Sequence, residues 1–281
     1  MKNQFPNDIP INRWGAPGQT PLFFLHANSY SAKMYQTFLQ PLFSDYDIVA
    51  PDLPGHGESR WDGLIYAWQD LADEYIRMLE KTPPQTPMLG MGHSIGGIVI
   101  MLIALQRPDW FSKIILLDPV LLPKPILWVI RTLRFVSLSQ IIPVARAAER
   151  RKSHFPTKQA ALDHYGRKSV FANWETGMLE TYIETCLKDD GEGTLTLSCS
   201  PRLESSIYQS IPAYVWELPA QLKAPTLFLI GEQSDTIDQR GVQQLQKLAG
   251  NHVVKRIAGG HLFPFENSVE SMNLVKEFLA K

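Results

Sequence analysis

The stretch MLGMGHSIGGIVIMLIAL, residues 88–105, constrains the fold of this chain more than any other segment. Three glycines, Gly92, Gly96 and Gly97, surround Ser94 within an otherwise apolar run. Because glycine weakens both helices and strands, this spacing indicates a backbone shape that larger residues do not permit. We expect a buried strand, a sharp turn at Ser94 and then a buried helix, with glycines where neighbouring chain comes close.

Short apolar runs alternate with amphipathic helical patterns along the chain, which is typical of a parallel sheet covered by helices. The expected strands are residues 21–27, 46–52, 87–93, 113–119, 225–231 and 252–258. The expected helices are residues 31–43, 66–81, 94–106, 241–250 and 267–280. The first 20 residues leave room for one or two short leading strands. The uncharged run 87–106 is long enough to imitate a membrane span, but its glycines favour the buried strand and helix.

Residues 120–218 interrupt this alternation. They contain helical patterns, as at 126–138 and 177–189, and prolines, but no convincing strand. We therefore predict an α/β core domain of residues 1–119 and 219–281, with a helical cap of residues 120–218 inserted between two strands. The basic block RAAERRK, residues 146–152, is interpreted as a solvated helix face.

Charge and cysteine usage restrict the possible partners and compartment. The chain of 281 residues has 27 Lys and Arg against 28 Asp and Glu, a net charge of −1. This balance argues against a nucleic-acid-binding surface or a polybasic membrane anchor. Cys186 and Cys199 lack CxxC spacing and are interpreted as reduced thiols, and the segment MKNQFPNDIPINRW lacks the apolar core of a secretion signal. The sequence predicts a cytoplasmic protein without a nucleic-acid or membrane partner, and leaves the oligomeric state open.

A serine hydroxyl is hardly ionised at neutral pH, so Ser94 requires a base and an acid that orients the base. Asp235 and His261 each follow a predicted strand. The carboxyl ends of parallel strands share one edge of a sheet, so these two residues are expected to lie near Ser94. Asp118, at the carboxyl end of the predicted strand 113–119, is the alternative acid, and Glu232 and Asp238 are weaker candidates.

The other histidines considered are interpreted as structural: His26, His56, His93 and His252. The histidines lack paired ligand spacing and the cysteines are not grouped with them, so the sequence predicts no metal site.

Five motifs together resemble the α/β-hydrolase superfamily, in its group with a serine nucleophile and a helical cap between strands six and seven. They are FLHAN (24–28), PDLPGHGES (51–59), GHSIGG (92–97), IGEQSD (230–235) and GGHLFPFE (259–266), in the order that this family has. The resemblance implies an α/β-hydrolase fold with a mostly parallel, twisted sheet. It also implies that Ser94 is the nucleophile, His261 the general base and then acid, and Asp235 the residue that fixes the imidazole tautomer.

The resemblance further implies an oxyanion hole made by the backbone N–H groups of Asn28 and Ile95. In the loop that holds Asn28, His-Ala-Asn replaces the commoner His-Gly-x. At this loop the sequence departs from the family pattern.

The serine nucleophile favours acyl transfer to water over the dehalogenase and epoxide-hydrolase chemistry that uses aspartate at this position. We expect a carboxylic-ester hydrolase without a cofactor, acting on a small to medium, mainly apolar substrate. Trp128, Phe135 and Trp174 of the cap are the expected substrate-binding residues, whereas a preference for carboxylates would point to Arg131 or Arg134. The alternatives are a carbon–carbon bond hydrolase or lyase on the same scaffold, and a non-catalytic ligand receptor.

Overall fold

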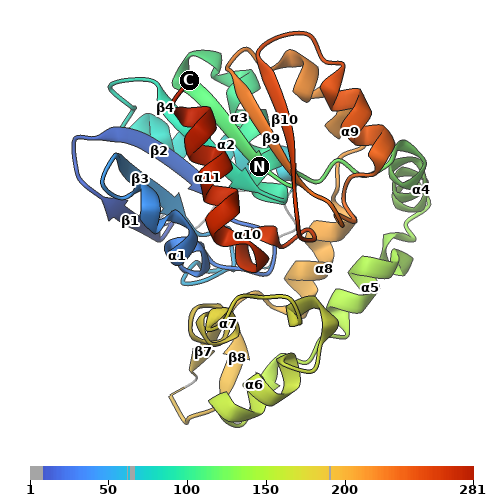
Figure 1. The fold of residues 1–281 in the computed structure, drawn as a ribbon. Coiled ribbons are helices and arrows are strands. Elements are labelled where there is room, and N and C mark those ends of the chain that lie inside the picture. Colours follow the sequence, from blue (N-terminus) through green and yellow to red (C-terminus); the bar gives the residue numbers. More distant parts are fainter. Residues whose placement is uncertain (1–8, 62, 64–66, 190) are drawn as a thin grey trace.

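The computed structural model describes residues 9–61, 63, 67–189 and 191–281, which form a mostly parallel sheet covered by helices (Figure 1). Within these residues the large sheet has seven strands in the order β1-β3-β2-β4-β5-β9-β10, and β1 alone is antiparallel to its neighbour. The strands are β1 Ile11–Gly15, β2 Thr20–Leu25, β3 Tyr46–Pro51, β4 Met88–His93, β5 Phe111–Leu117, β9 Thr226–Gly231 and β10 His252–Ile257. The predicted α/β class and all six predicted strands are confirmed.

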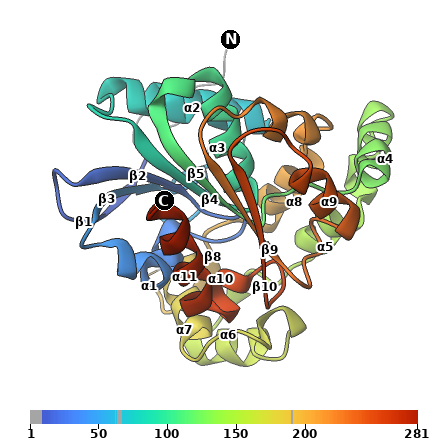
Figure 2. The ribbon, with the colours of Figure 1, turned by 45° about the horizontal axis from the view of Figure 1, so that its top comes forward.

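The central strands β2, β4 and β9 are mainly apolar without alternation because both faces of the sheet are covered there. In β2, Phe23 and Leu25 belong to the core on one face, whereas Leu22 and Phe24 belong to the core on the other. Helices α2 (Trp68–Lys81), α3 (Ile95–Gln106) and α9 (Gln239–Gln246) cover the first face. Helices α1 (Gln36–Leu39) and α11 (Ser268–Leu279) cover the second (Figure 2).

Three helix predictions differ from the structure in their bounds by two residues or more. The helix predicted over 241–250 is α9, Gln239–Gln246. The predicted helix 31–43 is divided into η1 (Ala32–Tyr35), α1 and η2 (Gln40–Leu42). Pro41 lies in η2, where it has no backbone N–H to continue the α-helical ladder. The predicted helix 66–81 begins at Trp68 in the structure, and Tyr66 lies outside the described residues.

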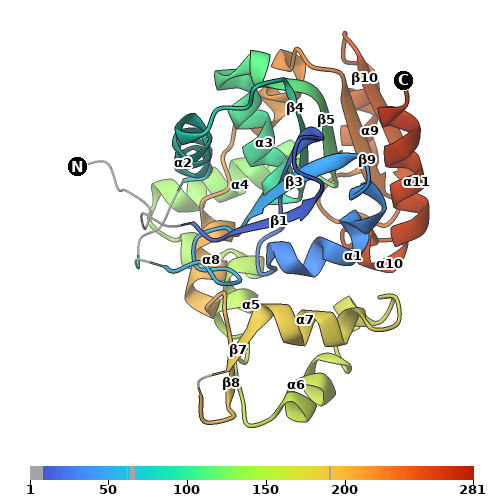
Figure 3. The ribbon, with the colours of Figure 1, turned by 90° about the vertical axis from the view of Figure 1, so that its left-hand side faces the viewer.

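Most of the segment between β5 and β9 forms a lobe below the carboxyl edge of the sheet (Figure 3), whereas its first helix, α4, lies beside α9 at the level of the core (Figure 1). Its helices are α4 Lys124–Phe135, α5 Pro143–Glu149, α6 Lys158–Tyr165, α7 Met178–Cys186 and α8 Pro201–Gln209. The prediction that this segment contains no strand is wrong, because β6 (His154–Phe155), β7 (Leu187–Asp189) and β8 (Leu195–Leu197) form a small antiparallel sheet. Strands of two or three residues are too short to produce a periodic sequence pattern.

The insertion lies between the fifth and sixth strands of the large sheet in chain order, counted over the described residues. The family pattern led us to expect strands six and seven, a count that includes one more strand before the insertion. The exact division into a core and a cap at residues 120 and 218 stays a prediction. No helix within the described residues is both long enough and apolar enough to cross a membrane.

The turn at Ser94 has the strained shape that the glycines indicated. Ser94 has φ 59° and ψ −122°, a conformation that residues other than glycine rarely adopt. A Cβ atom on Gly96 would lie 2.2 Å from the backbone oxygen of Leu25, and one on Gly92 would lie 2.5 Å from the backbone of Gly96. The backbones at the end of β2 and the start of α3 therefore lie so close together that no side chain fits at Gly96.

This close approach gives a stability prediction for two adjacent glycines. Gly96→Ala is expected to lower the free energy of unfolding by about 3 kcal/mol, because backbone atoms must move to admit the methyl group. In Gly97→Ala the methyl group would have its nearest neighbours at 3.2 and 3.3 Å, so only small shifts are needed and we expect a smaller loss. The better helix propensity of alanine, about 1 kcal/mol, offsets part of the cost in both variants. Urea denaturation of both variants measures the difference, and equal losses would contradict the steric explanation.

Candidate active site

Ser94, His261 and Asp118 form a hydrogen-bonded chain at the carboxyl edge of the sheet. His261 Nε2 lies 2.9 Å from Ser94 Oγ, and His261 Nδ1 lies 2.7 Å from Asp118 Oδ2. Ser94 follows β4, Asp118 follows β5 and His261 follows β10. A serine, an imidazole and a carboxylate in this order are the arrangement that activates a serine hydroxyl as a nucleophile.

The prediction that Asp235 contacts the imidazole is corrected by this geometry. Asp118 is fully buried and occupies that position, whereas Asp235 is exposed and has no hydrogen bond to His261 among the described residues. The loop that contains Asp235 instead supports Asp118. The Gly231 N–H donates to Asp118 Oδ1 at 2.9 Å, and the Ser234 and Thr236 hydroxyls donate to Oδ2 at 2.6 and 2.8 Å.

The electrostatics favour an Asp118 anion beside His261. Burial raises the pKa of Asp118, but the hydrogen bond and charge of His261, followed by the donors Ser234 and Gly231, outweigh burial and lower it below its usual value. Burial likewise lowers the pKa of His261, but the hydrogen bond and charge of Asp118 outweigh it and raise the pKa above 6.5, with smaller contributions from Asp235 and Glu266. The imidazole is thus more basic than an ordinary histidine.

Three of the four histidines interpreted as structural are buried in fixed hydrogen bonds around this chain. His93 Nε2 donates to the backbone oxygen of His261 at 2.8 Å, and His26 Nε2 accepts from the Leu53 N–H at 2.8 Å. Burial lowers the pKa of His26 to about 4 and those of His56 and His93 to about 3. These rings are neutral at neutral pH and hold the loops around Ser94 in place.

Ser94 and His261 face a cavity of about 350 Å³. Its walls are mainly apolar, and Asn28 and Ile95, the predicted oxyanion residues, both line it. Ile95 is the first residue of α3, where a backbone N–H has no partner in the helical ladder. The Asn28 side chain is held on both sides, because Nδ2 donates to the Glu204 backbone oxygen at 3.3 Å and Oδ1 lies 3.2 Å from His56 Nε2.

None of the three aromatic residues predicted to bind substrate lines this cavity. Trp128 and Phe135 are 66% and 89% exposed on α4, and they border a separate surface groove together with Arg131 and Arg134. Trp174 packs among Tyr30, Phe171, Tyr182 and Phe265 instead. The helical pattern of the cap predicted apolar faces but did not reveal which face turns toward Ser94.

The apolar wall of the cavity comes from residues that sequence analysis did not select. They are Trp68, Val120, Leu122, Val144, Ile207 and Ile211, from α2, α5, α8 and the loops between elements. These residues are ordinary core-type side chains in the sequence, so no local signal separates them from other apolar residues. Within the described residues, no group of three or more His, Cys, Asp or Glu side chains is placed to hold a metal ion.

A buried ion pair, also not predicted, joins the cap to the loop after β2. Arg151 Nη1 donates to Glu204 Oε2 at 2.7 Å and to Ser29 Oγ at 3.2 Å, and Nη2 donates to the Tyr182 hydroxyl. Ser29 has a positive φ of 74° and directly follows Asn28. Arg151 therefore helps to fix the loop that contains Asn28.

Comparison with known proteins agrees with this architecture. A family model described as "Alpha/beta hydrolase family" matches residues 22–272. The chain belongs to the alpha/beta hydrolase family. It is 38% identical over 102 residues to the uncharacterized hydrolase YugF of Bacillus subtilis, covering 36% of this chain and 37% of that protein. It is 31% identical over 113 residues to the lipase LipV of Mycobacterium tuberculosis, covering 40% of this chain and 42% of the lipase. The matched region thus spans well under half the length of these curated relatives.

Solved structures of alpha/beta hydrolases resemble the chain over nearly its whole length. The E-2-(acetamidomethylene)succinate hydrolase has a TM-score of 0.79 at 15% identity, covering 96% of this chain and 94% of that chain. The thioesterase domain from the curacin biosynthetic pathway has a TM-score of 0.76 at 20% identity, with the same coverage. These similarities show a shared fold, including the cap, with members of the family whose sequences have diverged widely.

The contacts of His261 predict how its titration responds to substitution. We expect the His261 imidazole to titrate above pH 6.5, Asp118→Asn to lower that pKa, and Asp235→Asn to lower it less, because Asp235 acts only through space. A raised pKa in the folded state contributes stability below pH 6.5 that is lost as the pH rises through the folded pKa. NMR titration of the His261 ring protons measures this pKa in the native protein and in both variants. A larger shift in Asp235→Asn than in Asp118→Asn would contradict the geometry.

Proposed function

We propose that this protein is a serine hydrolase that cleaves a carboxylic ester, or a related acyl bond, of a small to medium, mainly apolar substrate. The observation that carries this proposal is the chain from Ser94 Oγ to His261 to Asp118, at 2.9 and 2.7 Å, beside an apolar cavity. The name of the matched lipase LipV supports ester hydrolysis as the reaction class.

In the first half of the proposed reaction, Ser94 Oγ attacks the carbonyl carbon of the substrate while His261 Nε2 accepts the hydroxyl proton. The negative charge that develops on the carbonyl oxygen is stabilised by the N–H groups of Ile95 and Asn28, each such donor being worth roughly 3 kcal/mol. Asp118 keeps the imidazole in the tautomer that accepts at Nε2 and stabilises the imidazolium. The intermediate then collapses, His261 protonates the departing alcohol, and an acyl-enzyme remains on Ser94.

In the second half, a water molecule takes the place of the alcohol. His261 accepts a proton from this water as its oxygen attacks the acyl carbon, and the second tetrahedral intermediate expels Ser94. The proton returns to Ser94 Oγ and the carboxylic acid leaves. The apolar cavity walls hold the acyl group. They also keep water away from the oxyanion, which strengthens the hydrogen bonds to it.

A chromogenic ester series from acetate to dodecanoate tests this proposal. We expect the native protein to turn over repeatedly and Ser94→Ala to lose essentially all activity. Asp118→Asn is expected to lower kcat by about 10⁴-fold, the size of effect seen when a triad aspartate is replaced by asparagine. Asp235→Asn is the matched control, with the same chemical change at an exposed carboxylate of the same cavity. We expect less than about a tenfold loss there, because this residue does not contact the imidazole.

Other outcomes of this experiment identify the alternatives. Turnover that survives Ser94→Ala excludes a serine nucleophile. A folded protein that hydrolyses no ester directs attention to a carbon–carbon bond hydrolase or lyase, or to a receptor that binds a ligand without multiple turnover.

The pH dependence provides a separate test, because only the neutral imidazole acts as the base. We expect kcat/KM to rise with pH and to reach half its maximum above pH 6.5, since Asp118 raises the pKa of His261. In Asp118→Asn the residual activity should reach half its maximum at a lower pH. Steady-state rates in buffers of constant ionic strength measure this shift. A profile that falls with rising pH in this range would contradict a general-base role for His261.

A further inference from the structure

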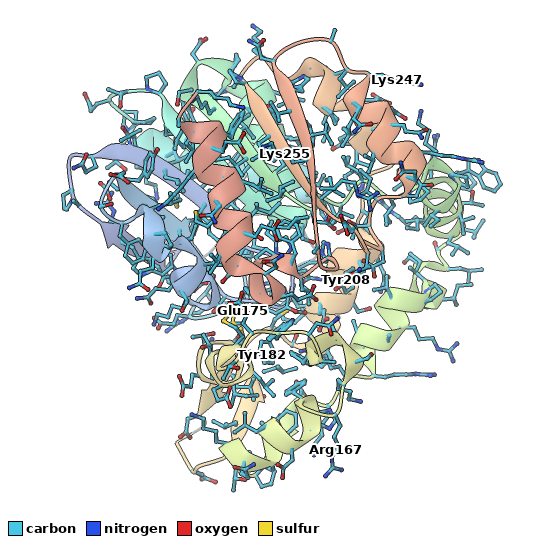
Figure 4. The ribbon with its side chains drawn as sticks, viewed as in Figure 1. Arg167, Glu175, Tyr182, Tyr208, Lys247 and Lys255 are labelled. Carbon is cyan, nitrogen blue, oxygen red and sulfur yellow. The ribbon has the colours of Figure 1, made fainter. Side chains whose placement is uncertain are left out.

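A second cavity, which we call the cap chamber, adjoins the cavity of Ser94. It has a volume of about 560 Å³ and lies between α5, the segment from α6 to Phe171, α8 and the loop after β2. Five residues line both spaces, which therefore meet along them: Asn28, Tyr30, Val144, Val170 and Tyr208. Figure 4 shows Tyr208 at the level where the core meets the cap. A substrate held at Ser94 can therefore extend into the cap chamber.

The cap chamber has an excess of positive charge. Four cationic side chains line it, Arg150, Arg151, Lys152 and Lys168, against a single described carboxylate, Glu204. Glu204 is already neutralised, because its Oε2 accepts from Arg151 Nη1 at 2.7 Å. Over the described part of the chain, Arg150, Lys152 and Lys168 have no carboxylate within 4.0 Å. All three are exposed, and Lys152 Nζ lies 4.9 Å from the centroid of the Phe155 ring, a contact that leaves its charge unneutralised. Their charges are thus available to a ligand.

The local fold explains why these cations gather here. Ala145 and Ala148 of α5 are buried, and α5 packs closely against α8, so the chain that leaves α5 carries residues 150–152 along the chamber wall. Arg151 is then held over the rings of Tyr165 and Tyr182, at 5.5 and 5.9 Å. Arg150 and Lys152 of the basic block are exposed, as the interpretation as a solvated face requires, and they also border the cap chamber.

His164, which also lines the cap chamber, responds to this charge. Its pKa is lowered below 6.5, first by burial and then by the positive charges of Lys168, Lys152, Arg151 and Arg167. The Ser94 cavity differs, since the charged groups that line it are Asp235 and, when protonated, His261. One space is suited to an apolar group and the other to an anion.

We propose that the cap chamber binds an anionic group, a carboxylate or a phosphate, at the end of the substrate remote from the bond that is cleaved. The apolar middle of the substrate lies against Val144, Val170 and Tyr208, and Lys152 and Lys168 contact the anion. The sequence led us to expect uncharged esters, with Arg131 or Arg134 as the residues for a carboxylate. Those two arginines border the separate groove with Trp128 and Phe135, so they do not serve this site. This inference rests on the proposed esterase function for its kinetic test.

Matched pairs of esters test the proposal. Each pair has the same leaving group and the same acyl chain, from butanoate to dodecanoate, ending in either a methyl group or a carboxylate. We expect kcat/KM for the longer carboxylate-ended esters to exceed that of their methyl-ended partners by about tenfold, the effect of one hydrogen bond to a charged group. The preference should appear in KM and weaken with added salt. Phosphate-ended esters distinguish the two anions: a larger preference assigns the chamber to phosphate, and a smaller one to carboxylate.

Neighbouring cations provide the variant and its control. Lys168→Gln should lower kcat/KM for the carboxylate-ended ester about tenfold and leave the methyl-ended ester unchanged. Lys152→Gln should act in the same direction. Arg167→Gln removes the same charge one residue away, from a side chain that points outward in Figure 4 and is not among the described residues of the chamber lining. Its charge reaches the chamber only through space, as at His164, so it should lower kcat/KM for the carboxylate-ended ester far less than Lys168→Gln and leave the methyl-ended ester unchanged.

Direct binding separates this inference from the proposed reaction. Calorimetry with Ser94→Ala should show that dodecanedioate binds about tenfold more tightly than dodecanoate, and that Lys168→Gln removes the difference. If this holds while no ester is hydrolysed, the anion site stands and the esterase proposal fails. If neutral esters are hydrolysed without any preference for an anion, or if the preference survives Lys152→Gln and Lys168→Gln, the anion site is overturned and the esterase proposal stands.

Discussion

The close contact between the end of β2 and the start of α3 is the constraint on which the rest of the site depends. With no side chain at Gly96, the first turn of α3 packs directly against the backbone of Leu25. This contact brings the loop of Asn28 and the turn of Ser94 to the same place, so that Asn28 and Ile95, the residues proposed for the oxyanion hole, line one cavity. The strain at Ser94 is tolerated because the buried residues of β4 and α3 hold the turn from both ends.

The carboxylate of Asp118 is held by the loop after β9 as well as by its own strand, β5. Asp118 leaves β5 with a positive φ of 41°, and its carboxylate accepts hydrogen bonds from the loop after β9 as well as from His261. A buried carboxylate requires such donors, because unpaired charge in the interior is costly. The residues next to Asp235 thus belong to the site as donors to Asp118, even though Asp235 is not the partner of His261.

The cap is attached to this core through polar contacts near Asn28. Asn28 donates to the backbone of Glu204, Glu204 pairs with Arg151, and Arg151 donates to Ser29. These contacts close a ring between the loop after β2, α8 and the chain after α5. Asn28 lines both cavities, whereas Ser29, Arg151 and Glu204 line the cap chamber alone. One set of contacts therefore orients the loop and forms part of the chamber wall.

The sequence by itself determined the sheet, its order of strands and helices along the chain, and two members of the hydrogen-bonded chain. Apolar runs of six or seven residues and a glycine-flanked serine are local signals, and His261 follows a strand whose carboxyl end must lie at the same edge as Ser94. Only the tertiary structure decided between Asp118 and Asp235, because both follow strands that are adjacent in the sheet and the sequence contains nothing about which side chain turns inward. It also decided which cap residues face Ser94 and that the basic block lines a chamber. The positions of the cap residues and of the basic block depend on how α4, α5 and α8 pack. Helical periodicity predicts that a helix has an apolar face, but it does not predict which element covers that face.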